Sequence, residues 1–419
     1  MDSYLTQNNR KRCSSGKFIL WVLPWFGLLF FGVFCAFLCL LFGLNQTNMS
    51  DIFAFGLWIV LDLAVIALGA GAFFSGFLTY IIGKNELKDI INAAVVIGFI
   101  CYSAAGPMIA IDVGQPVRMW FIFWHANIHS MLVEVSFCIT CYLGVLLIEY
   151  IPIIIQNKNL NSIKALRLFG DNLHHLVAIF AGTGVFLSFF HQGSLGGMWG
   201  VLYGRPFAAR DGFYVWPWTF FLFIFSAIAA GPCFTIICTR LTEFISGKKL
   251  VSEKAIQTLA KISGFTLSGY LIFRIADIIG WNYGIVPDAG QRFTDFFREG
   301  PYGIWLLVCE IILFGIVPAM ILTIPKTRKN GAWLIIGCIM NCTGVVLNRF
   351  IYVIVTLAIP VMPFDKFWSY LPTWQEWGIA LGLVGYGFLI FSFSYRYLPL
   401  FPERLSENEL NRMTNNLRL

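Results

Sequence analysis

The stretch FGLWIVLDLAVIALGAGAFFSGFLTYI, residues 55–81, decides the class of fold. Its only charged residue is Asp62, and the other side chains are almost all apolar. A helix rises about 1.5 Å per residue, so about 20 apolar residues cross the roughly 30 Å hydrocarbon core of a bilayer. The stretch therefore predicts a transmembrane helix that carries an acid inside the membrane.

The rest of the chain repeats this pattern. Hydrophobic residues make up 58% and charged residues 12% of the sequence, which excludes a soluble globular domain. Apolar runs of spanning length predict an all-α integral membrane protein with ten transmembrane helices. We place these helices at 18–44, 52–82, 90–111, 130–156, 171–190, 214–246, 258–281, 302–324, 331–359 and 375–398.

The distribution of lysine and arginine predicts the orientation of the helices. Of the 29 basic residues, 21 fall on the side of the N-terminus, 6 on the other side and 2 inside helices. Because basic loops stay on the cytoplasmic side, both termini are expected in the cytoplasm. The tails would be residues 1–17 and 399–419, around a membrane domain at 18–398. The net charge of +7 then reflects topology, and we expect no nucleic-acid partner.

The eleven cysteines do not indicate a metal site. The closest pair, Cys138 and Cys141, has C-x-x-C spacing but lies in the middle of the fourth predicted helix. No second pair completes a set of four ligands, so we interpret these cysteines as helix-packing residues.

Ionisable residues inside the predicted helices indicate a polar interior. A charged group in hydrocarbon costs a few kcal/mol or more unless it faces water, a partner or the bundle interior. One interpretation is a set of structural ion pairs, since Arg274 and Asp277 share one helical face. The other is a proton path, which would comprise Asp62, Arg274, Asp277, Glu310, Arg349 and, at the cytoplasmic end, Asp171, His174 and His175.

A second polar set gathers at the predicted outer face, where the third, fourth and fifth helices begin or end. Imidazole and carboxylate groups exchange protons, and His or Gln side chains can hydrogen-bond a quinone carbonyl. His125 and His129 are expected to enter the fourth helix there. The residues that we predict to bind a quinone are His191, Gln192, Glu134, Asp112 and Arg118.

The stretch SFFHQGSLGGMWG, residues 188–200, is expected to leave the membrane at this face. Its glycines at 193, 196 and 197 would let the chain leave the helix and let a flat ring approach. A lone histidine at a helix end is by default bonded to a carbonyl. With a neighbouring acid, arginine and amide, His191 instead indicates a site.

Three motifs carry a resemblance to a known family. They are the Asp-x-Gly-x-Pro loop at 112–116, HQGSLG at 191–196 and YLPTWQEWGIALGLVGYGFLIFSFSYRYLP at the end of the membrane domain. In this order the chain resembles the NrfD/polysulfide reductase membrane-subunit family, which includes HybB-type hydrogenase subunits, over nearly its whole length. Residues 55–81 are especially similar to the DsrP branch, which belongs to the sulfite reductase-associated DsrMKJOP complex.

The resemblance implies a quinone-interacting subunit without a haem or iron–sulfur cluster of its own and with no catalytic residues. Two four-helix bundles, helices 2–5 and 6–9, would surround a quinone site near the outer face. It assigns roles there to Asp112, Arg118, His191 and Gln192. The expected partners are a periplasmic ferredoxin-like iron–sulfur subunit, a multihaem cytochrome c and other membrane or cytoplasmic subunits. The setting would be dissimilatory sulfur metabolism in a bacterial or archaeal cytoplasmic membrane.

Two other classes of function stay open at this point. A proton-coupled transporter would also bury acids and arginines, although no inverted repeat is evident. A membrane cytochrome with haem b would use histidines as axial ligands, but His174 and His175 lie at the opposite end of the fifth helix from His191. An absorption spectrum separates the cytochrome from the quinone-binding subunit.

Overall fold

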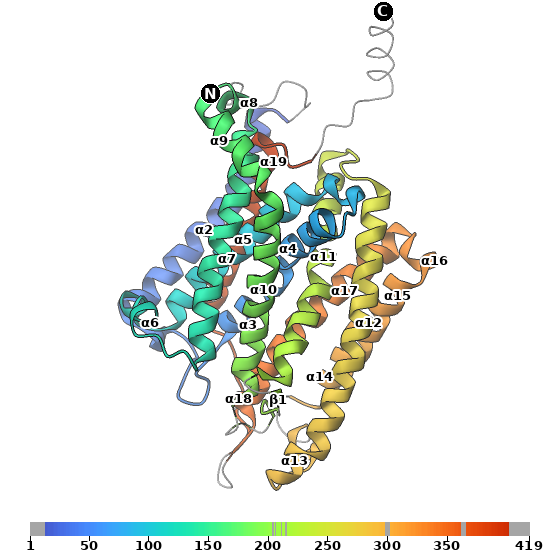
Figure 1. The fold of residues 1–419 in the computed structure, drawn as a ribbon. Helices are drawn as coiled ribbons and strands as arrows, with labels where there is room; N and C mark the ends of the chain where they lie inside the picture. The colour runs from blue at the N-terminus through green and yellow to red at the C-terminus, as the bar shows by residue number, and fades with distance from the viewer. Residues whose placement is uncertain are drawn as a thin grey trace, which may run out of the picture.

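The protein is an α-helical bundle whose helices run between two faces (Figure 1). The computed structural model describes residues 13–202, 205, 207–210, 212–213, 216–297, 302–361 and 366–401. Within these ranges, the side chains outside the description are those of Ala72, Lys158, His174, His175, Val177 and Phe213.

The described ranges hold nine helical spans that are long and apolar enough to cross a membrane. A tenth span is formed if two helices that meet at 57° are counted together. These are α9 (Lys164–His175) and α10 (Val177–Gly200). The prediction of an all-α, ten-helix membrane fold is therefore confirmed.

The membrane helices come in two groups and one outlying pair. The first group comprises α3 (Leu57–Gly69) with α4 (Gly71–Gly76) and the π-helix η2 (Phe77–Ile81), α5 (Ile91–Asp112), α7 (Met131–Ile155) and α10. The second comprises α11 (Trp218–Ser246), α12 (Glu253–Tyr283), α14 (Ile304–Val308) with the π-helix η6 (Cys309–Ile316) and α15 (Val317–Thr323), and α17 (Gly331–Phe350) with the π-helix η7 (Ile351–Val355) and α18 (Thr356–Ala358). The outlying pair, α2 (Ser15–Phe42) and α19 (Trp374–Tyr397), packs on α5.

Short elements close the two ends of the bundle. They are η1 (Leu44–Gln46), η3 (Asn85–Asp89), η4 (Pro116–Arg118), α6 (Phe121–Trp124), α8 (Lys158–Asn161), β1 (Gly212–Phe213), β2 (Trp216–Pro217), α13 (Ile285–Asp288), η5 (Phe293–Phe296) and α16 (Pro325–Arg328). The two strands form a small antiparallel ladder that the sequence did not predict.

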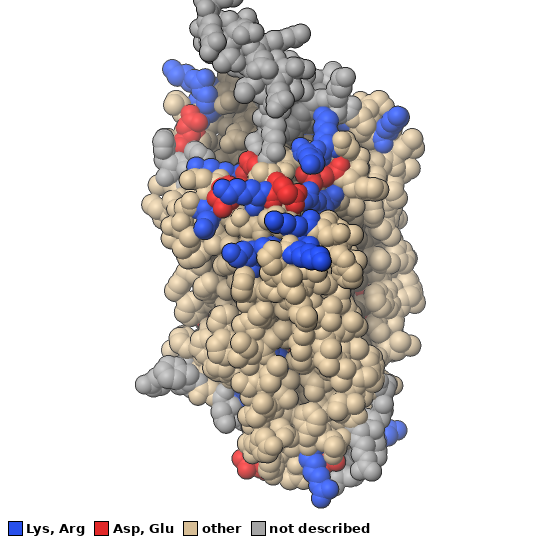
Figure 2. All heavy atoms as spheres, turned by 90° about the vertical axis from the view of Figure 1, so that its right-hand side faces the viewer, with Lys and Arg blue, Asp and Glu red and all other residues tan. Residues whose placement is uncertain are grey.

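We call the end where α2 begins and α19 ends the basic face. There the Arg396 guanidinium donates a hydrogen bond to the Cys13 carbonyl oxygen at 3.3 Å, so both ends of the described chain meet. Figure 2 shows lysine and arginine side chains gathered toward this end, above a broad apolar belt. The other end, with α6, α13 and β1, is the opposite face.

Helix α11 joins the two groups, because it packs on α3, α4 and α10 as well as on α12 and α17. At its closest crossing, a Cβ atom on Gly71 would collide with the carbonyl oxygen of Gly231. Small residues let membrane helices approach in this way. Gly71 therefore serves close packing of α4 on α11.

Candidate functional site

Helix α10 does not end at His191, as the sequence analysis expected, but continues to Gly200. Its glycines let α11 approach closely: a Cβ atom on Gly193 would collide with the ring of Phe220, and one on Gly196 with the carbonyl oxygen of Thr219. The prediction that this helix ends at residue 190 is therefore wrong. Glycines inside a membrane helix serve helix packing here rather than chain exit.

His191 and Gln192 are consequently deep inside the first group of helices, with 0% and 1% of their surface exposed. Among the described residues, neither ring nitrogen of His191 and neither amide atom of Gln192 has a hydrogen-bond partner. The backbone of Val135 interacts with His191 and the hydroxyl of Tyr102 interacts with Gln192, but neither contact has the geometry of a hydrogen bond. Buried polar groups without partners are rare in proteins, and they indicate a place for a ligand or water.

Tyrosines and a serine surround this pair. The rings of Tyr102 and His191 lie 5.6 Å apart, and the hydroxyls of Tyr102 and Ser188 form a hydrogen bond of 3.1 Å. The ring of Tyr142 packs edge-on against Tyr102 at 4.4 Å, and its buried hydroxyl has no partner among the described residues. The sequence analysis missed these hydroxyls because single Tyr and Ser residues in apolar helices carry no pattern.

Two buried carboxylates lie on the same side of the first group. Asp62 of α3 and Asp112, the last residue of α5, are close enough to interact electrostatically, and each has one oxygen without a partner in the described structure. Asp112 also interacts with Glu376 of α19. The Glu376 carboxylate accepts a hydrogen bond from Tyr370, and burial, reinforced by this carboxylate, raises the pKa of Tyr370. The phenol therefore stays protonated and donates.

The remaining predicted quinone residues lie nearer the surface. Glu134 is half-buried in the first turn of α7, beside Ser194 of α10. Arg118 is exposed on η4. His125 and His129 are exposed in the connection before α7, so the expectation that they enter the fourth helix is wrong. The structure thus places His191 and Gln192 together on α10, and Asp62 within interaction range of Asp112. Tyr102 packs against His191 and interacts electrostatically with Asp62, whereas Arg118 is exposed.

The second group of helices contains a different kind of polar cluster, which we call the ionic network. Arg274 donates to Glu310 at 3.0 and 3.2 Å and to Asp277 at 2.7 Å. It also donates to the hydroxyl of Tyr352 at 2.8 Å. Every one of these side chains is buried. The predicted pairing of Arg274 with Asp277 is confirmed, and it is one link of a larger set.

Two further arginines complete the ionic network. Arg210 donates to Asp277 at 2.7 Å, and Arg349 reaches Glu310 through Asn348, with bonds of 2.6 and 2.7 Å. The Arg349 guanidinium also lies 3.5 Å from the ring centre of Phe223. Three arginines against two acids leave a formal excess of one positive charge. The sequence analysis placed Arg210 in an outer loop, where nothing in the sequence marks it as buried.

Two π-helices flank the ionic network. Glu310 lies in η6, and Arg349 lies two residues before η7. A π-helix carries an extra residue per turn and often occurs at functional positions, because it redirects side chains that a regular helix would turn away. Here it directs Glu310 and Tyr352, the latter in η7, toward Arg274.

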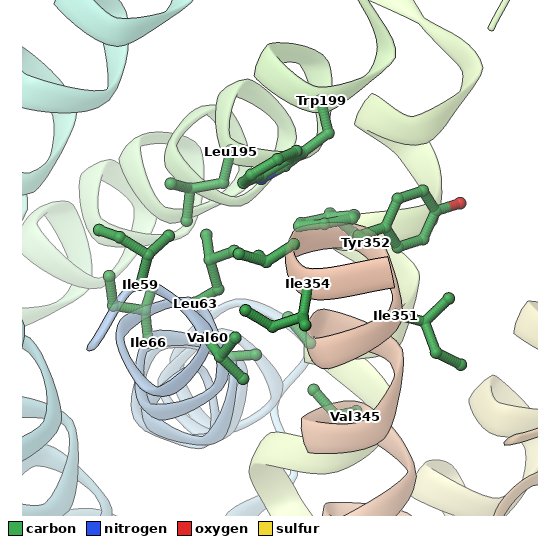
Figure 3. Packing of buried hydrophobic residues seen from close by; sticks show 14 of the residues in the cluster. Ile59, Val60, Leu63, Ile66, Leu195, Trp199, Val345, Ile351, Tyr352 and Ile354 are labelled. Carbon is green, nitrogen blue, oxygen red and sulfur yellow. The ribbon is translucent and has the colours of Figure 1, made fainter. Parts of the chain in front are cut away.

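An apolar layer separates the two clusters. In Figure 3, Val60 and Leu63 of α3 face Ile354 of η7, with Leu195 and Trp199 of α10 beside them. Within the described residues, no hydrogen bond or ion pair links the ionic network to Asp62, His191 or Gln192. The predicted proton path through both clusters therefore has no direct side-chain link here among the described residues, and it stays a prediction. His175 lies outside the described side chains.

A small polar cavity opens in the first group on its basic-face side. It has a volume of about 50 Å³, and its wall includes Tyr80, Tyr142, Glu149 and the exposed Gln156. A cavity of this size holds a few water molecules. Glu149 lies inside the fourth predicted helix, so the rule that singled out Glu134 also marks it, although the sequence analysis omitted it.

Comparison with known proteins gives consistent relatives. The family model described as Polysulphide reductase, NrfD, matches residues 45–360. The chain is 50% identical over 413 residues to the menaquinone reductase integral membrane subunit of Nitratidesulfovibrio vulgaris, with 98% of each chain covered. It is 24% identical to the probable Ni/Fe-hydrogenase 2 b-type cytochrome subunit of Escherichia coli K12, with 89% and 90% covered. It is 23% identical to the Hdr-like menaquinol oxidoreductase integral membrane subunit of Archaeoglobus fulgidus, with 82% and 84% covered.

Proposed function

The chain belongs to the polysulphide reductase NrfD family, and we propose that it is the quinone-interacting membrane subunit of a multi-subunit redox complex. Menaquinone is the proposed quinone, because two relatives carry it or its reduced form in their names. The special likeness to the DsrP branch and the role in dissimilatory sulfur metabolism stay predictions.

The observation that carries this proposal is the buried pair His191–Gln192 with its unpartnered donors and acceptors. A quinone ring presents two carbonyl oxygens on an otherwise apolar body, and binding sites for such ligands are apolar with a few placed polar groups. The His191 ring and the Gln192 amide each donate one hydrogen bond to such oxygens. The half-buried Glu134 lies between this pair and the lipid-facing side of α7, where we propose that the ring enters.

Quinone reduction takes up protons together with electrons, so the site needs a proton supply. We propose that protons come from the basic face through the polar cavity at Glu149 and then along Tyr142, Tyr102 and Ser188. Asp62 and Asp112, which lie close enough to interact electrostatically, are proposed as further proton-exchanging groups of this site. An entry at Asp171, His174 and His175 stays a prediction, since the side chains of His174 and His175 lie outside the described residues. If the basic face is cytoplasmic, each turnover moves charge across the membrane.

The ionic network has a different proposed role. Arg274, Asp277, Glu310 and Arg349 neutralise one another through short hydrogen bonds, so a proton moved among them would leave a buried charge without its partner. We propose that the network fixes the second group of helices, against which α10 is held through α11.

The orientation and the partners are proposed together. Because basic loops stay in the cytoplasm, the basic face is proposed to be cytoplasmic and the opposite face periplasmic. A ferredoxin-like iron–sulfur subunit would then dock over α6, α13 and β1 and exchange electrons with the quinone. A multihaem cytochrome c subunit is proposed to lie further out in the complex.

The test is to replace His191 with Ala in the assembled complex and to measure quinone turnover and the affinity for a quinone analogue. Loss of a proton-transferring or hydrogen-bonding group predicts a fall in turnover on the order of 10² to 10⁴. The matched control is His129→Ala, because His129 is an exposed histidine in the connection before α7.

The level of assembled complex distinguishes a functional from a folding defect. We expect it to be unchanged in both variants, because His191 makes no hydrogen bond in the described structure. Unchanged turnover and analogue affinity in His191→Ala contradict the proposal.

A further inference from the structure

A long groove runs down the outside of the bundle, on the side of α3 and α5 away from the quinone-binding pair. Its volume is about 900 Å³. Its walls come from α2, α3, α5, α11 and α19, which contribute mainly Leu, Ile, Val and Phe side chains. The pair α2–α19 packs on α5 but not on this half of α11, and this leaves the groove between them.

One end of the groove is strongly basic. Lys17, Lys248, Lys249 and Arg396 line it at the basic face, together with the hydroxyl groups of Thr242, Ser246, Ser392 and Tyr395, and no Asp or Glu lines its described wall. The acidic side chains of this turn, Glu243 and Glu253, form ion pairs with Arg240, with Oε2 of each within 2.5–2.7 Å of a guanidinium nitrogen, and Glu253 also interacts electrostatically with Lys249. The described rim therefore holds more basic than acidic side chains.

The length of the groove identifies its occupant. The α19 wall runs from Ala380 to Arg396, which corresponds to about 24 Å at about 1.5 Å per residue. One leaflet of the hydrocarbon core is about 15 Å thick, half of roughly 30 Å. The groove therefore has the length of the acyl chains of one leaflet plus a headgroup. Basic pockets between transmembrane helices on the cytoplasmic side are suited to anionic headgroups.

We propose that this groove binds an anionic glycerophospholipid. Its phosphate group lies at Lys17, Lys248 and Lys249, and its acyl chains extend along α11 and α19 toward Val384. The lipid fills the space between α2–α19 and α11 and supports the outer sides of α3 and α5. A neutral quinone fits the apolar walls but gives no reason for the basic side chains that line one end of the groove.

The test measures lipid binding to the purified, delipidated full-length chain in neutral detergent, by native mass spectrometry and thermal unfolding. We expect phosphatidylglycerol to bind and to raise the unfolding temperature, and phosphatidylcholine to do neither. The double variant Lys248→Gln/Lys249→Gln should bind phosphatidylglycerol at least about tenfold more weakly. Val384→Trp, which fills the groove, should bind it weakly as well.

Matched controls leave the groove intact. Lys326→Gln/Lys329→Gln removes two exposed lysines from the same face, and Leu381→Trp enlarges an exposed side chain of α19 that does not line the groove. Both should bind phosphatidylglycerol as the native chain does. Equal binding of phosphatidylcholine, or normal phosphatidylglycerol binding by Val384→Trp, overturns the proposal.

A photo-crosslinker at position 384 in the assembled complex tests the remaining occupants. Attachment to lipid supports the proposal, whereas attachment to a partner subunit, to a second copy or to a quinone overturns it. Quinone-analogue affinity, measured in the same variants, reports separately on the site at His191.

Discussion

The two groups of helices bury polar side chains in opposite ways. In the second group, Arg274, Asp277 and Glu310 bond to one another, whereas in the first group His191 and Gln192 make no hydrogen bond in the described structure. Paired charges need one another for the fold to be stable. Unpaired polar groups weaken the fold and are retained where a ligand completes them. We therefore expect the ionic network to stabilise the fold, and the residues around His191 and Gln192 to bind a ligand.

The largest effect that this comparison predicts comes from removing an acid from the ionic network. Asp277→Asn takes the negative charge from between Arg274 and Arg210 and leaves two buried cations underneutralised. We expect a loss of about 3–5 kcal/mol of stability, which lowers the unfolding temperature and the yield of folded protein in detergent.

Asp62→Asn is the matched change in the first group. Asp62 forms no ion pair with a described residue, so its neutral amide should cost less than about 1 kcal/mol, while turnover falls. Equal destabilisation by the two variants would show that the clusters do not differ in the way proposed.

The second prediction concerns the close packing of α10 on α11. Gly196→Ala places a methyl group against the Thr219 carbonyl and Phe223, and overpacking of this kind costs about 1–3 kcal/mol. Gly144→Ala on α7 is the control, because a Cβ atom there meets nothing within 4 Å. Thermal unfolding of both variants measures the difference. A stable Gly196→Ala would mean that α10 leaves the bundle near His191 after all.

How far the sequence leads is visible at these same residues. Segment length and hydropathy predict the membrane spans, because a helix that crosses a bilayer must be long and apolar. A charged residue inside such a span is predicted to face the interior of the bundle. This rule does not mark Arg210, because Arg210 lies between two predicted helices and is buried by tertiary contacts with Asp277 and Trp281. The end of α10 could not be predicted from the sequence either, because a Gly-rich stretch is compatible with both a helix end and close helix packing. Only the position of α11 in the fold distinguishes the two.

The third prediction tests the proposed proton route. Glu149→Gln keeps the shape of the side chain that lines the polar cavity but removes its exchangeable proton. We expect quinone turnover to fall about tenfold, corresponding to about 1.4 kcal/mol in the barrier, with unchanged analogue affinity. Stopped-flow reduction of the quinone in the purified complex measures the rate.

Glu134→Gln is the informative companion to this variant. Glu134 lies at the proposed entrance for the ring, so its replacement should change the analogue affinity more than Glu149→Gln does. If Glu149→Gln turns over at the native rate, the protons reach the site by another way.

The smallest predicted effect is also the sharpest test of the comparison, because one kind of change is made in both groups. Gln192→Leu removes an amide that has no hydrogen bond in the described structure, so stability should stay the same or rise by about 1 kcal/mol, while quinone binding is lost. Asn348→Leu removes an amide that accepts from Arg349 at 2.6 Å and donates to Glu310 at 2.7 Å, and it should destabilise. The two variants should shift the unfolding temperature in opposite directions. Burying the Gln192 amide costs desolvation energy without a compensating hydrogen bond, whereas the two hydrogen bonds of Asn348 offset the cost of burying its amide. If both variants lowered the unfolding temperature, His191 and Gln192 would have hydrogen-bond partners within the protein. Their donors and acceptors would then not indicate a ligand site.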